Sequence, residues 1–334
     1  MKTFTRRGAM ALGASFAGAA ALAACGEGSG GSSSGVELRM STQQADTAPI
    51  VAGFKEWGEA VASRTENDVS IEVFPSAQLG SDEDVIEQAL NGTNVAVLTD
   101  GAAMGNYVKE MGITNMPYIT DNYEEVVALT DTDAFRELDE QLREEGIRIL
   151  AYNWYDGPRN FYTNKEIVVP ADLNGQRIRT AGAPVWQEGI ASLGATPIAM
   201  PWGEAYNALQ SQAIDGVEVQ SGSAYPSSLW EVTSTMTRTS HIQLANFILV
   251  GETWASTVPE DVFQIIAEEC VTAATANAQE VLAATEEFDA LMEEEGLIIN
   301  EVDVEPFREA SQEAYEKLGF EELRDSVWSE MGKA

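Results

Sequence analysis

Hydrophobic positions between residues 36 and 217 follow two spacings in turn, one with a period of two and one with a period near 3.6. The shorter period is typical of strands and the longer one of helices. The pattern predicts strands at 36–40, 69–74, 95–98, 147–152, 161–163, 177–179, around 197–200 and from 215, and helices at 50–63, 81–91, 122–145, 184–193 and 203–210. This alternation predicts a largely parallel α/β fold that is repeated in two halves.

The C-terminal quarter has a different pattern. Residues 259–296 form one continuous helical pattern with no proline after Pro259. Acidic residues at its start complement the helix dipole, and Gly296 can end it. We expect so long a helix to pack across both halves of the protein and to brace them. A further helix is expected at 304–318 and would be the last one of the chain.

The first 35 residues have the composition of an export signal followed by a tether. Residues 1–24 begin with basic side chains, among them Arg6 and Arg7, and continue into an apolar run without any acid. The pair of arginines is similar to a twin-arginine signal, and the general secretory route fits equally well. Residues 22–25 resemble a bacterial lipobox, so Cys25 is expected to carry lipid. Residues 25–35 are rich in glycine and serine and are expected to form a flexible tether.

Only two cysteines are present, which limits the alternatives for each of them. Cys25 could instead be buried or joined in a disulfide, but it directly follows the signal and precedes the tether. If Cys25 carries lipid, Cys270 has no partner within the chain. Cys270 lies in the helical pattern of residues 262–275, and we expect it to be a small buried hydrophobic residue.

Composition excludes several classes of function. Of the 334 residues 54 are acidic and 19 are basic, which gives a formal net charge of −35, and 44% are hydrophobic. The hydrophobic content predicts a folded chain of about two domains at roughly 150 residues each. The acidity argues against a nucleic-acid partner, because phosphate binding needs clustered lysine and arginine. A single histidine and two distant cysteines argue against a zinc centre or a Cys/His nucleophile.

No sequence motif points to a particular reaction. The chain contains no nucleophile elbow, P-loop, dinucleotide fingerprint or His-Glu-x-x-His motif. We therefore expect neither a cofactor nor a metal, and no enzymatic activity. An enzyme that uses paired carboxylates, such as Asp100 and Glu218, remains an alternative.

Basic residues are scarce in the middle of the chain and therefore informative. Between residues 149 and 236 they are Arg159, Lys165, Arg177 and Arg179. Arginine suits a carboxylate because its planar fork donates two parallel hydrogen bonds. Arg177 and Arg179 share one face of the predicted strand, and Arg179, beside the following turn, is the better placed for a cleft. For any one of these arginines a surface ion pair remains the alternative.

Aromatic side chains occur near the same strand ends, with Trp154 before Arg159 and Trp202 after residue 200. Binding sites in open α/β sheets form outside the carboxyl ends of the strands. Trp154 and Trp202 are therefore candidates for the walls of a ligand site, although each one alone could belong to the core.

A series of motifs in a fixed order resembles the solute-binding proteins of tripartite ATP-independent periplasmic (TRAP) transporters. The motifs are residues 171–179 (ADLNGQRIR), 193–200 (LGATPIAM), 204–210 (EAYNALQ) and 214–218 (IDGVE), preceded by 73–80 (VFPSAQLG), 90–92 (LNG) and 115–118 (NMPY). The resemblance covers essentially all of residues 36–330. Each motif alone is short, and their common order makes the resemblance specific.

The resemblance implies a two-lobed periplasmic-binding-protein-like α/β fold with a long C-terminal helix that braces both lobes. Lobe I would comprise 36–156 and 245–284, and lobe II would comprise 157–244 and 285–334. Such a protein is an extracytoplasmic receptor that captures a small organic acid and delivers it to a permease driven by an ion gradient. With Cys25, this implies a membrane-anchored lipoprotein.

The resemblance also implies roles for single residues. Arg179 matches the arginine that clamps the carboxylate of the ligand, and Arg159 matches a second arginine of the pocket. Trp202 lies where an aromatic side chain lines the ligand. Asp100 and Gln43, each after a strand of the first lobe, are expected to offer polar contacts.

The chain departs from the family pattern after the Asp-Gly-x-Glu segment. Many members have asparagine or tryptophan there, whereas this chain has Val219 and then Gln220, which we include among the expected ligand contacts. The substrate subclass therefore stays open between carboxylates, aromatic acids and zwitterions. His241 matches a family position too, and a buried hydrogen-bonding role is expected for it. A sensory lipoprotein on the same scaffold is a further alternative.

Overall fold

The computed structural model describes residues 35–333. The predicted signal at 1–24, the lipid attachment at Cys25 and the tether up to residue 34 lie outside the described residues. No helix among the residues that are described is long and apolar enough to cross a membrane.

Within residues 35–333 the strands form one nine-stranded sheet in the order β2-β1-β3-β8-β4-β7-β5-β6, with β9 paired to β8. The strands are β1 (Val36–Ser41), β2 (Val69–Phe74), β3 (Val95–Thr99), β4 (Ile147–Thr163), β5 (Arg177–Thr180), β6 (Thr196–Ala199), β7 (Gly216–Gln220), β8 (Thr235–Gly251) and β9 (Ile298–Glu301). The strands at the two ends of the sheet pair in parallel, β1 with β2 and β3, and β5 with β6 and β7. These two parallel ends form the cores of the two lobes.

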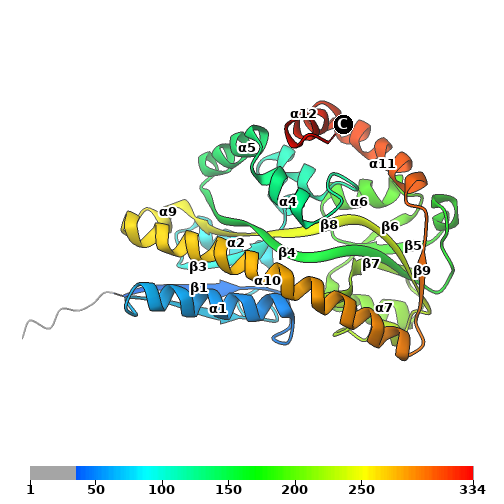
Figure 1. The fold of residues 1–334 in the computed structure, drawn as a ribbon, viewed down its shortest axis with the longest axis horizontal. Coiled ribbons are helices and arrows are strands. Elements are labelled where there is room, and N and C mark those ends of the chain that lie inside the picture. The colour runs from blue at the N-terminus through cyan, green and yellow to red at the C-terminus, as the bar shows by residue number, and fades with distance from the viewer. Residues whose placement is uncertain (1–34, 334) are drawn as a thin grey trace, which may run out of the picture. The chain divides into compact units, whose positions relative to one another are not determined.

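The middle of the sheet corrects the expectation of a largely parallel fold. Strands β4 and β8, each 17 residues long, pair antiparallel with each other, and they pair antiparallel with β7 and β3. The predicted strands at 147–152 and 161–163 are therefore parts of one strand. Gly157 adopts φ +106° beside a register shift, so the strand continues past Gly157 and Pro158 with a bulge. The long strands join the two lobes (Figure 1).

Helices cover both faces of the sheet (Figure 1). They are α1 (Pro49–Arg64), α2 (Asp82–Leu90), α3 (Gly101–Met104), α4 (Tyr123–Thr130), α5 (Asp133–Glu144), α6 (Pro184–Ser192), α7 (Ala205–Gln210), α8 (Ser221–Ala224), α9 (Glu252–Ala255), α10 (Glu260–Glu294), α11 (Glu305–Leu318) and α12 (Glu321–Met331). Helix α10 contacts α1 and β4 and also α8 and β9. It therefore runs along both parallel ends of the sheet, which confirms the predicted bracing helix.

Two predicted helices differ from the structure. The pattern at 122–145 divides into α4 and α5, because Thr132 between them accepts a hydrogen bond from the amide of Phe135 and caps the start of α5. Helix α11 is also not the last one. It ends at Gly319, with φ +71°, and α12 follows, where the Trp328 indole donates to the Ile119 carbonyl.

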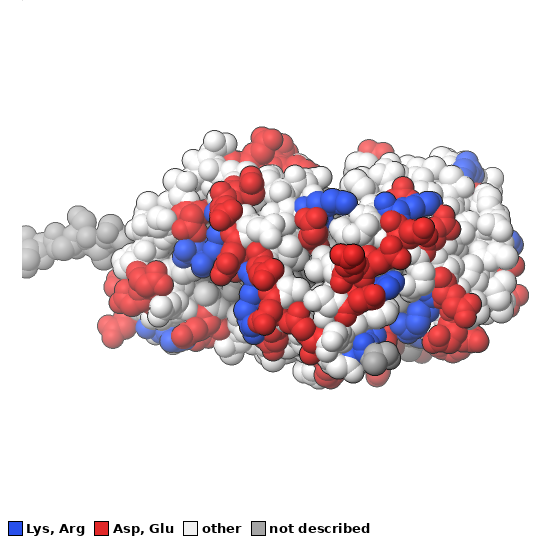
Figure 2. Space-filling view, turned by 90° about the horizontal axis from the view of Figure 1, so that it is seen from above, with Lys and Arg blue, Asp and Glu red and all other residues white. Residues whose placement is uncertain are grey.

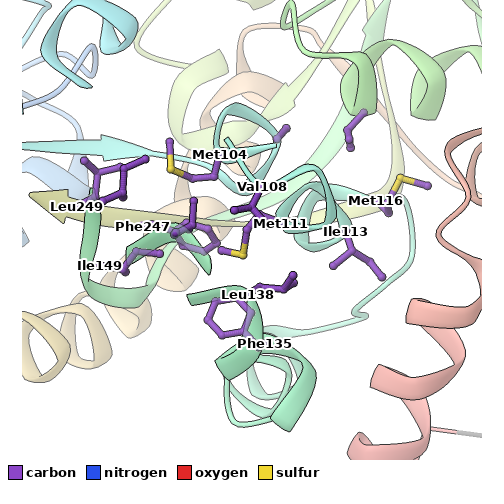
Figure 3. Close-up of a cluster of buried hydrophobic side chains, with 14 of the residues drawn as sticks. Met104, Val108, Met111, Ile113, Met116, Phe135, Leu138, Ile149, Phe247 and Leu249 are labelled. Carbon is purple, nitrogen blue, oxygen red and sulfur yellow. The ribbon is translucent and has the colours of Figure 1, made fainter. Parts of the chain in front are cut away.

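The apolar core lies on both faces of the central strands. On one face Trp57 and Phe54 of α1 pack with α10 against the sheet, and Cys270 of α10 is fully buried among them, as predicted. On the other face Met104, Met111 and Met116, which lie in or near the 3₁₀ segment Lys109–Asn115, belong to one buried cluster with Phe135 of α5 (Figure 3). These cores hold the long strands in place, and the strands also carry buried polar residues such as Arg159 and Glu218.

The surface carries the large acidic excess. Acidic side chains spread over the face seen in Figure 2, with lysine and arginine scattered between them. Surface charge of this density keeps a protein soluble and repels anions at long range. An anionic ligand would therefore need a local site with its own positive charge.

Candidate functional site

A buried ion pair joins β4 and β7 near the middle of the sheet. Arg159 Nε lies 2.5 Å from Glu218 Oε2, and Arg159 Nη2 donates to Glu218 Oε1 at 2.8 Å and to the Glu218 carbonyl at 2.7 Å. Arg159 Nη1 donates to Gln220 Oε1 at 3.0 Å. Because the antiparallel register places residue 159 opposite residue 220, one guanidinium reaches both side chains. Four of the five N–H groups of Arg159 are thus already used.

Glu218 is fully buried and held in its charged form. Burial acts to raise the pKa of its carboxyl group, but the charge of Arg159 and the hydrogen bonds that Glu218 accepts outweigh burial and lower the pKa to about 2. Thr180 Oγ1 donates to Glu218 Oε1 at 2.7 Å. Glu218 is therefore a fixed anion whose role is to hold Arg159.

His241 lies beside this pair and is itself fully buried. Its Nδ1 lies 2.8 Å from Thr239 Oγ1, and its Nε2 lies 3.6 Å from Glu218 Oε2. Burial lowers the pKa of His241, and Glu218 opposes that effect. The ring stacks on Phe161. These contacts are those of the buried hydrogen-bonding residue that was expected.

Arg179 differs from every other arginine of the sheet. It is 7% exposed, and its guanidinium lies over the Trp202 ring at 5.3 Å from the ring centroid. Within the described part of the chain it makes one hydrogen bond, from Nε to the Met200 carbonyl at 2.9 Å, and no salt bridge. Its Nη1 and Nη2 groups therefore have four N–H donors without a protein acceptor.

Burial changes the pKa of Arg179. Loss of hydration lowers its pKa to about 10, with Glu218 opposing the shift and Arg159 adding to it. The side chain is still charged at neutral pH. Arg177, two residues earlier, is 41% exposed at its side chain and pairs with Asp215. Arg177 thus forms an ion pair at the surface, whereas Arg179 is a buried cation without an anion.

A pocket of about 170 Å³ adjoins Arg179. Its lining residues come from the segments after β1 and β2, from the 3₁₀ segment Trp202–Glu204 and from α8 and the loop that follows it: Gln43, Gln44, Ala45, Ala48, Ser76, Trp202, Gly222, Ser223, Pro226 and Ser227. Neither Arg159 nor Arg179 is among them. Arg179 meets the pocket through Trp202, because its guanidinium covers that ring.

A chain of amides links the pocket to the buried ion pair. Gln44 Nε2 donates to Asp156 Oδ2 at 3.1 Å, and Gln220 Nε2 donates to the same oxygen at 2.5 Å. Gln220 also bonds Ser223, which lines the pocket. Sequence reasoning missed Asp156 and Gln44. Their position directly beside Gly157 and Gln43 was the available signal.

Asp156 is buried and titrates near neutrality. Burial raises the pKa of its carboxyl group to about 7, against the opposing effects of Arg159 and of hydrogen bonds from Gln220 and Asn246. The folded protein therefore holds this proton more tightly than the unfolded chain does. The stabilisation that the proton provides is complete below about pH 4 and is lost as the pH rises through about 7.

Replacement of Asp156 by asparagine should remove this pH dependence. We expect the melting temperature of Asp156→Asn minus that of the wild type to increase from pH 5 to pH 8. Thermal unfolding of both proteins across this range measures the difference. Asp215→Asn is the control, because its pairing with Arg177 lowers the pKa of Asp215 and leaves it ionised throughout. A constant difference for Asp156→Asn would contradict the assignment.

The remaining candidates lie in different places. Asp100 is half-buried and caps α3, where its Oδ1 accepts from the Ala103 amide at 2.8 Å. Trp154 does not lie with the other candidates: it is fully buried in the core, packs on Phe54 and donates from its indole to Cys270 Sγ. The aromatic ring beside Arg159 is that of Trp186 on α6, at 4.6 Å from the guanidinium carbon.

Metal ligands do not gather in this cleft. Residues 35–333 contain no group of three or more histidine, cysteine, aspartate or glutamate side chains that could hold a metal ion.

The sequence matches the family described as bacterial extracellular solute-binding protein, family 7 (DctP), over residues 40–322. This is most of the chain. The protein belongs to this family. The assignment confirms the resemblance to TRAP solute-binding proteins, whose members are transport proteins.

Relatives and solved structures agree with the family. A TRAP periplasmic solute-binding protein from Escherichia fergusonii, in an apo open structure, is 33% identical, with a TM-score of 0.81 over 88% of this chain and 99% of that chain. One from Ochrobacterium anthropi with bound L-fuconate is 29% identical, with a TM-score of 0.84 over 89% and 99%. A solute-binding protein of Roseobacter denitrificans is 27% identical over 82% of this chain and 84% of its own length. These similarities confirm the two-lobed TRAP fold.

Proposed function

We propose that this TRAP solute-binding protein captures a small organic acid with Arg179 and delivers it to the membrane permease of a TRAP transporter. The observation that carries the proposal is the state of Arg179, a buried guanidinium whose four terminal N–H donors lack acceptors among the described residues. A buried charge without a partner is costly, and a carboxylate restores both the charge balance and the hydrogen bonds. The relative that was solved with L-fuconate holds an acid of this kind.

The other candidate residues take supporting roles in this proposal. Trp202 gives Arg179 a flat apolar wall, and Gln43 lines the pocket on the side of the first lobe. Arg159 has one N–H left after its bonds to Glu218 and Gln220, so it can contribute a single hydrogen bond to the ligand. Gln220 holds Asp156 and Ser223 and so orients the wall of the pocket.

Closure of the lobes would bury the bound acid. We propose lobe I at 36–156 and 245–284 and lobe II at 157–244 and 285–334, with β4 and β8 as the connections that bend. The contact from Ser223 to Gln44 Oε1, at 3.5 Å, would then lie between the lobes. A ligand that binds both lobes shifts the equilibrium toward the closed form. Lipid on Cys25 would keep the receptor at the membrane beside its permease.

The enzymatic alternative has little support in the geometry. Its pair of carboxylates was Asp100 and Glu218. Both oxygens of Glu218 accept hydrogen bonds from Arg159, and its pKa of about 2 leaves no proton to donate at neutral pH. We therefore infer binding without turnover.

A thermal-shift screen tests the proposed function. Organic acids and their uncharged methyl esters or amides would be added in matched pairs to the purified protein. We expect one class of acid to raise the melting temperature and its uncharged counterpart to have no effect, since a ligand that binds only the folded state stabilises it. Equal stabilisation by acid and ester would argue against an anion site at Arg179. Uptake of the same acid by cells with and without the permease would then test delivery.

A further inference from the structure

The hydrogen-bond chain between Arg159 and the pocket has a fixed direction. A guanidinium only donates hydrogen bonds, so the atom of Gln220 that Arg159 Nη1 reaches at 3.0 Å is the amide oxygen. The amide nitrogen of Gln220 therefore faces the other way, and it donates to Asp156 Oδ2 at 2.5 Å and to Ser223 Oγ at 3.0 Å. Gln220 is buried, and both hydrogens of its amide are used by these two bonds.

Ser223 accepts a hydrogen from Gln220 and must donate its own hydrogen elsewhere. The residue lines the pocket although it is only 8% exposed. The acceptor that its hydroxyl meets within residues 35–333 is Gln44 Oε1, at 3.5 Å. A hydrogen bond between two oxygen atoms is typically about 2.5–3.0 Å long, so this contact is too long to be a strong one. The hydroxyl hydrogen of Ser223 is therefore available to an acceptor in the pocket.

Gln44 presents the complementary group. Asp156 Oδ2 also accepts a hydrogen from Gln44 Nε2, at 3.1 Å, so the amide oxygen of Gln44 is the end that lies toward Ser223. Within the described chain this oxygen has no donor other than Ser223 at that long distance. The pocket wall therefore offers a hydrogen-bond donor from α8 and a hydrogen-bond acceptor from the segment after β1 side by side.

A hydroxyl group of a ligand matches both positions. Its oxygen can accept from Ser223 while its hydrogen is donated to Gln44 Oε1. An ionised carboxylate only accepts, so it would leave Gln44 Oε1 unpaired, and an ammonium group only donates, so it would leave the hydrogen of Ser223 unpaired. A site built to pair its polar groups with one ligand rejects a ligand that leaves them unpaired.

The pocket also favours an uncharged part of a ligand. None of the residues that line it is acidic or basic. A second ionised group of the ligand would lie there without a counter-ion, which costs free energy. Trp202 lines the pocket and lies beneath the guanidinium of Arg179, so an acid group at Arg179 can be followed by an uncharged chain in the pocket.

We propose that the ligand is a hydroxy acid, with its acid group on Arg179 and one of its hydroxyl groups bound by Ser223 and Gln44. Gln220 is the positioning residue that directs the hydroxyl of Ser223 into the pocket. The inference rests on the proposed function, because Arg179 is taken to hold the acid group. The substrate class is thus that of acids with one ionised group and an uncharged, hydroxylated chain, as opposed to dicarboxylates and amino acids.

Matched probes of equal chain length test the inference. The hydroxylated probes are glycerate, threonate, xylonate and gluconate, each in its D and L forms. Their counterparts of the same carbon number are the unsubstituted acid, the terminal amino acid and the dicarboxylate. We expect a hydroxylated probe to bind at least about tenfold more tightly than all three of its counterparts, which corresponds to about 1.4 kcal/mol. Titration calorimetry of the purified protein measures each affinity.

The outcomes distinguish this inference from the proposed function. A dicarboxylate, an amino acid or an unsubstituted acid that binds as tightly as every hydroxylated probe overturns the inference and leaves the proposed function standing. Binding by none of the acids contradicts both. Equal binding of a hydroxylated probe and its methyl ester would place the recognition in the pocket alone and would contradict the role of Arg179.

Ser223→Ala removes the donor and should abolish the selection. We expect the preference for the tightest hydroxylated probe over the unsubstituted acid to fall about tenfold, while the affinity for the unsubstituted acid changes by less than about twofold. Ser227→Ala is the matched control, because Ser227 lines the same pocket but does not belong to the hydrogen-bond chain. It should keep the preference. Equal losses for both probes in Ser223→Ala, or the same loss of preference in Ser227→Ala, would overturn the role of Ser223.

Gln220→Glu tests the positioning role with nearly the same side-chain shape. The oxygen that replaces the amide nitrogen would accept the hydrogen of Ser223 instead of donating to Ser223, so the ligand would lose this donor. The added negative charge weakens the binding of every acid, and the readout is therefore the ratio of the affinities for the hydroxylated and the unsubstituted acid. We expect this ratio to fall about tenfold, as in Ser223→Ala. An unchanged ratio would show that Gln220 does not direct Ser223.

Discussion

Replacement of Arg179 by methionine is expected to weaken ligand binding by about a hundredfold to ten-thousandfold. A carboxylate would accept two charge-assisted hydrogen bonds from the guanidinium, each worth about 1.5–3 kcal/mol, so their loss amounts to about 3–6 kcal/mol. Methionine keeps the apolar contact with Trp202 and removes only the charge and the donors. Arg179→Lys should show an intermediate loss, because the ammonium group keeps the charge without the planar fork. Calorimetric titration with the acid found by the thermal-shift screen measures these losses.

The ligand-free protein should respond in the opposite direction. Arg179 is a buried charge without a partner in the described chain, so Arg179→Met should leave the melting temperature unchanged or raise it. Arg177→Met is the matched control, since Arg177 lies on the same strand and pairs with Asp215 at the surface. It should change affinity by less than about twofold. An Arg179→Met protein that still binds the acid normally would refute the role given to Arg179.

The different environments of Arg177 and Arg179 could be predicted from the sequence. Period two places both on one strand face, and the turn after residue 180 favours the later one for the cleft. The structure agrees with this order of exposure, since Arg177 reaches Asp215 and Arg179 is covered. Local pattern and scarcity of basic residues were sufficient here, because both properties depend on neighbours close in the chain.

The position of Trp154 could not be predicted from the local sequence pattern. The sequence pattern predicts that a strand ends at residue 152, and this prediction puts Trp154 beside the site. Strand β4 in fact continues to Thr163, so Trp154 lies in mid-strand under α1 and α10. Trp186, which stacks on Arg159, lies in a predicted helix whose apolar face gave no reason to single it out. Which tryptophan contacts an arginine depends on strand length and helix packing, and hydrophobic periodicity predicts neither of them.

Most other differences between the sequence-based predictions and the structure involve the two long strands and pairs of residues far apart in the chain. Arg159 and Glu218 are 59 positions apart, and Gln44 and Asp156 are 112 apart, so their contacts follow from register and topology. Strand β8 has polar residues such as Gln243 and Asn246 among its buried positions, which breaks the alternation that would have revealed it. These polar residues face the buried hydrogen-bond network. The residues that interrupt the hydrophobic alternation of β8 therefore lie near the site.

Replacement of Arg159 by methionine is expected to destabilise the protein by about 3–5 kcal/mol, because it leaves the fully buried carboxylate of Glu218 without its cation. The melting temperature should fall on the order of 10 °C. The loss should shrink as the pH falls from about 4.5 toward 2. The folded-state pKa of Glu218, about 2, lies below its ordinary value, so the stabilisation by the ion pair is present above the unfolded pKa and is lost as the pH falls through the folded one. Thermal or urea unfolding across this pH range measures both effects.

A double-mutant cycle separates the ion pair from the loss of packing. Glu218→Gln alone should also be destabilising, since it leaves Arg159 buried without an anion, whereas Arg159→Met combined with Glu218→Gln should recover most of the stability. The exposed pair of Arg177 and Asp215 provides the comparison, and its coupling should not exceed about 1 kcal/mol. If the two buried substitutions were simply additive, Arg159 and Glu218 would not act as one unit. Recovery in the double variant would instead show that Glu218 holds Arg159 inside the sheet. The donors of Arg159 would then be occupied by Glu218, whereas those of Arg179 would be available for a ligand.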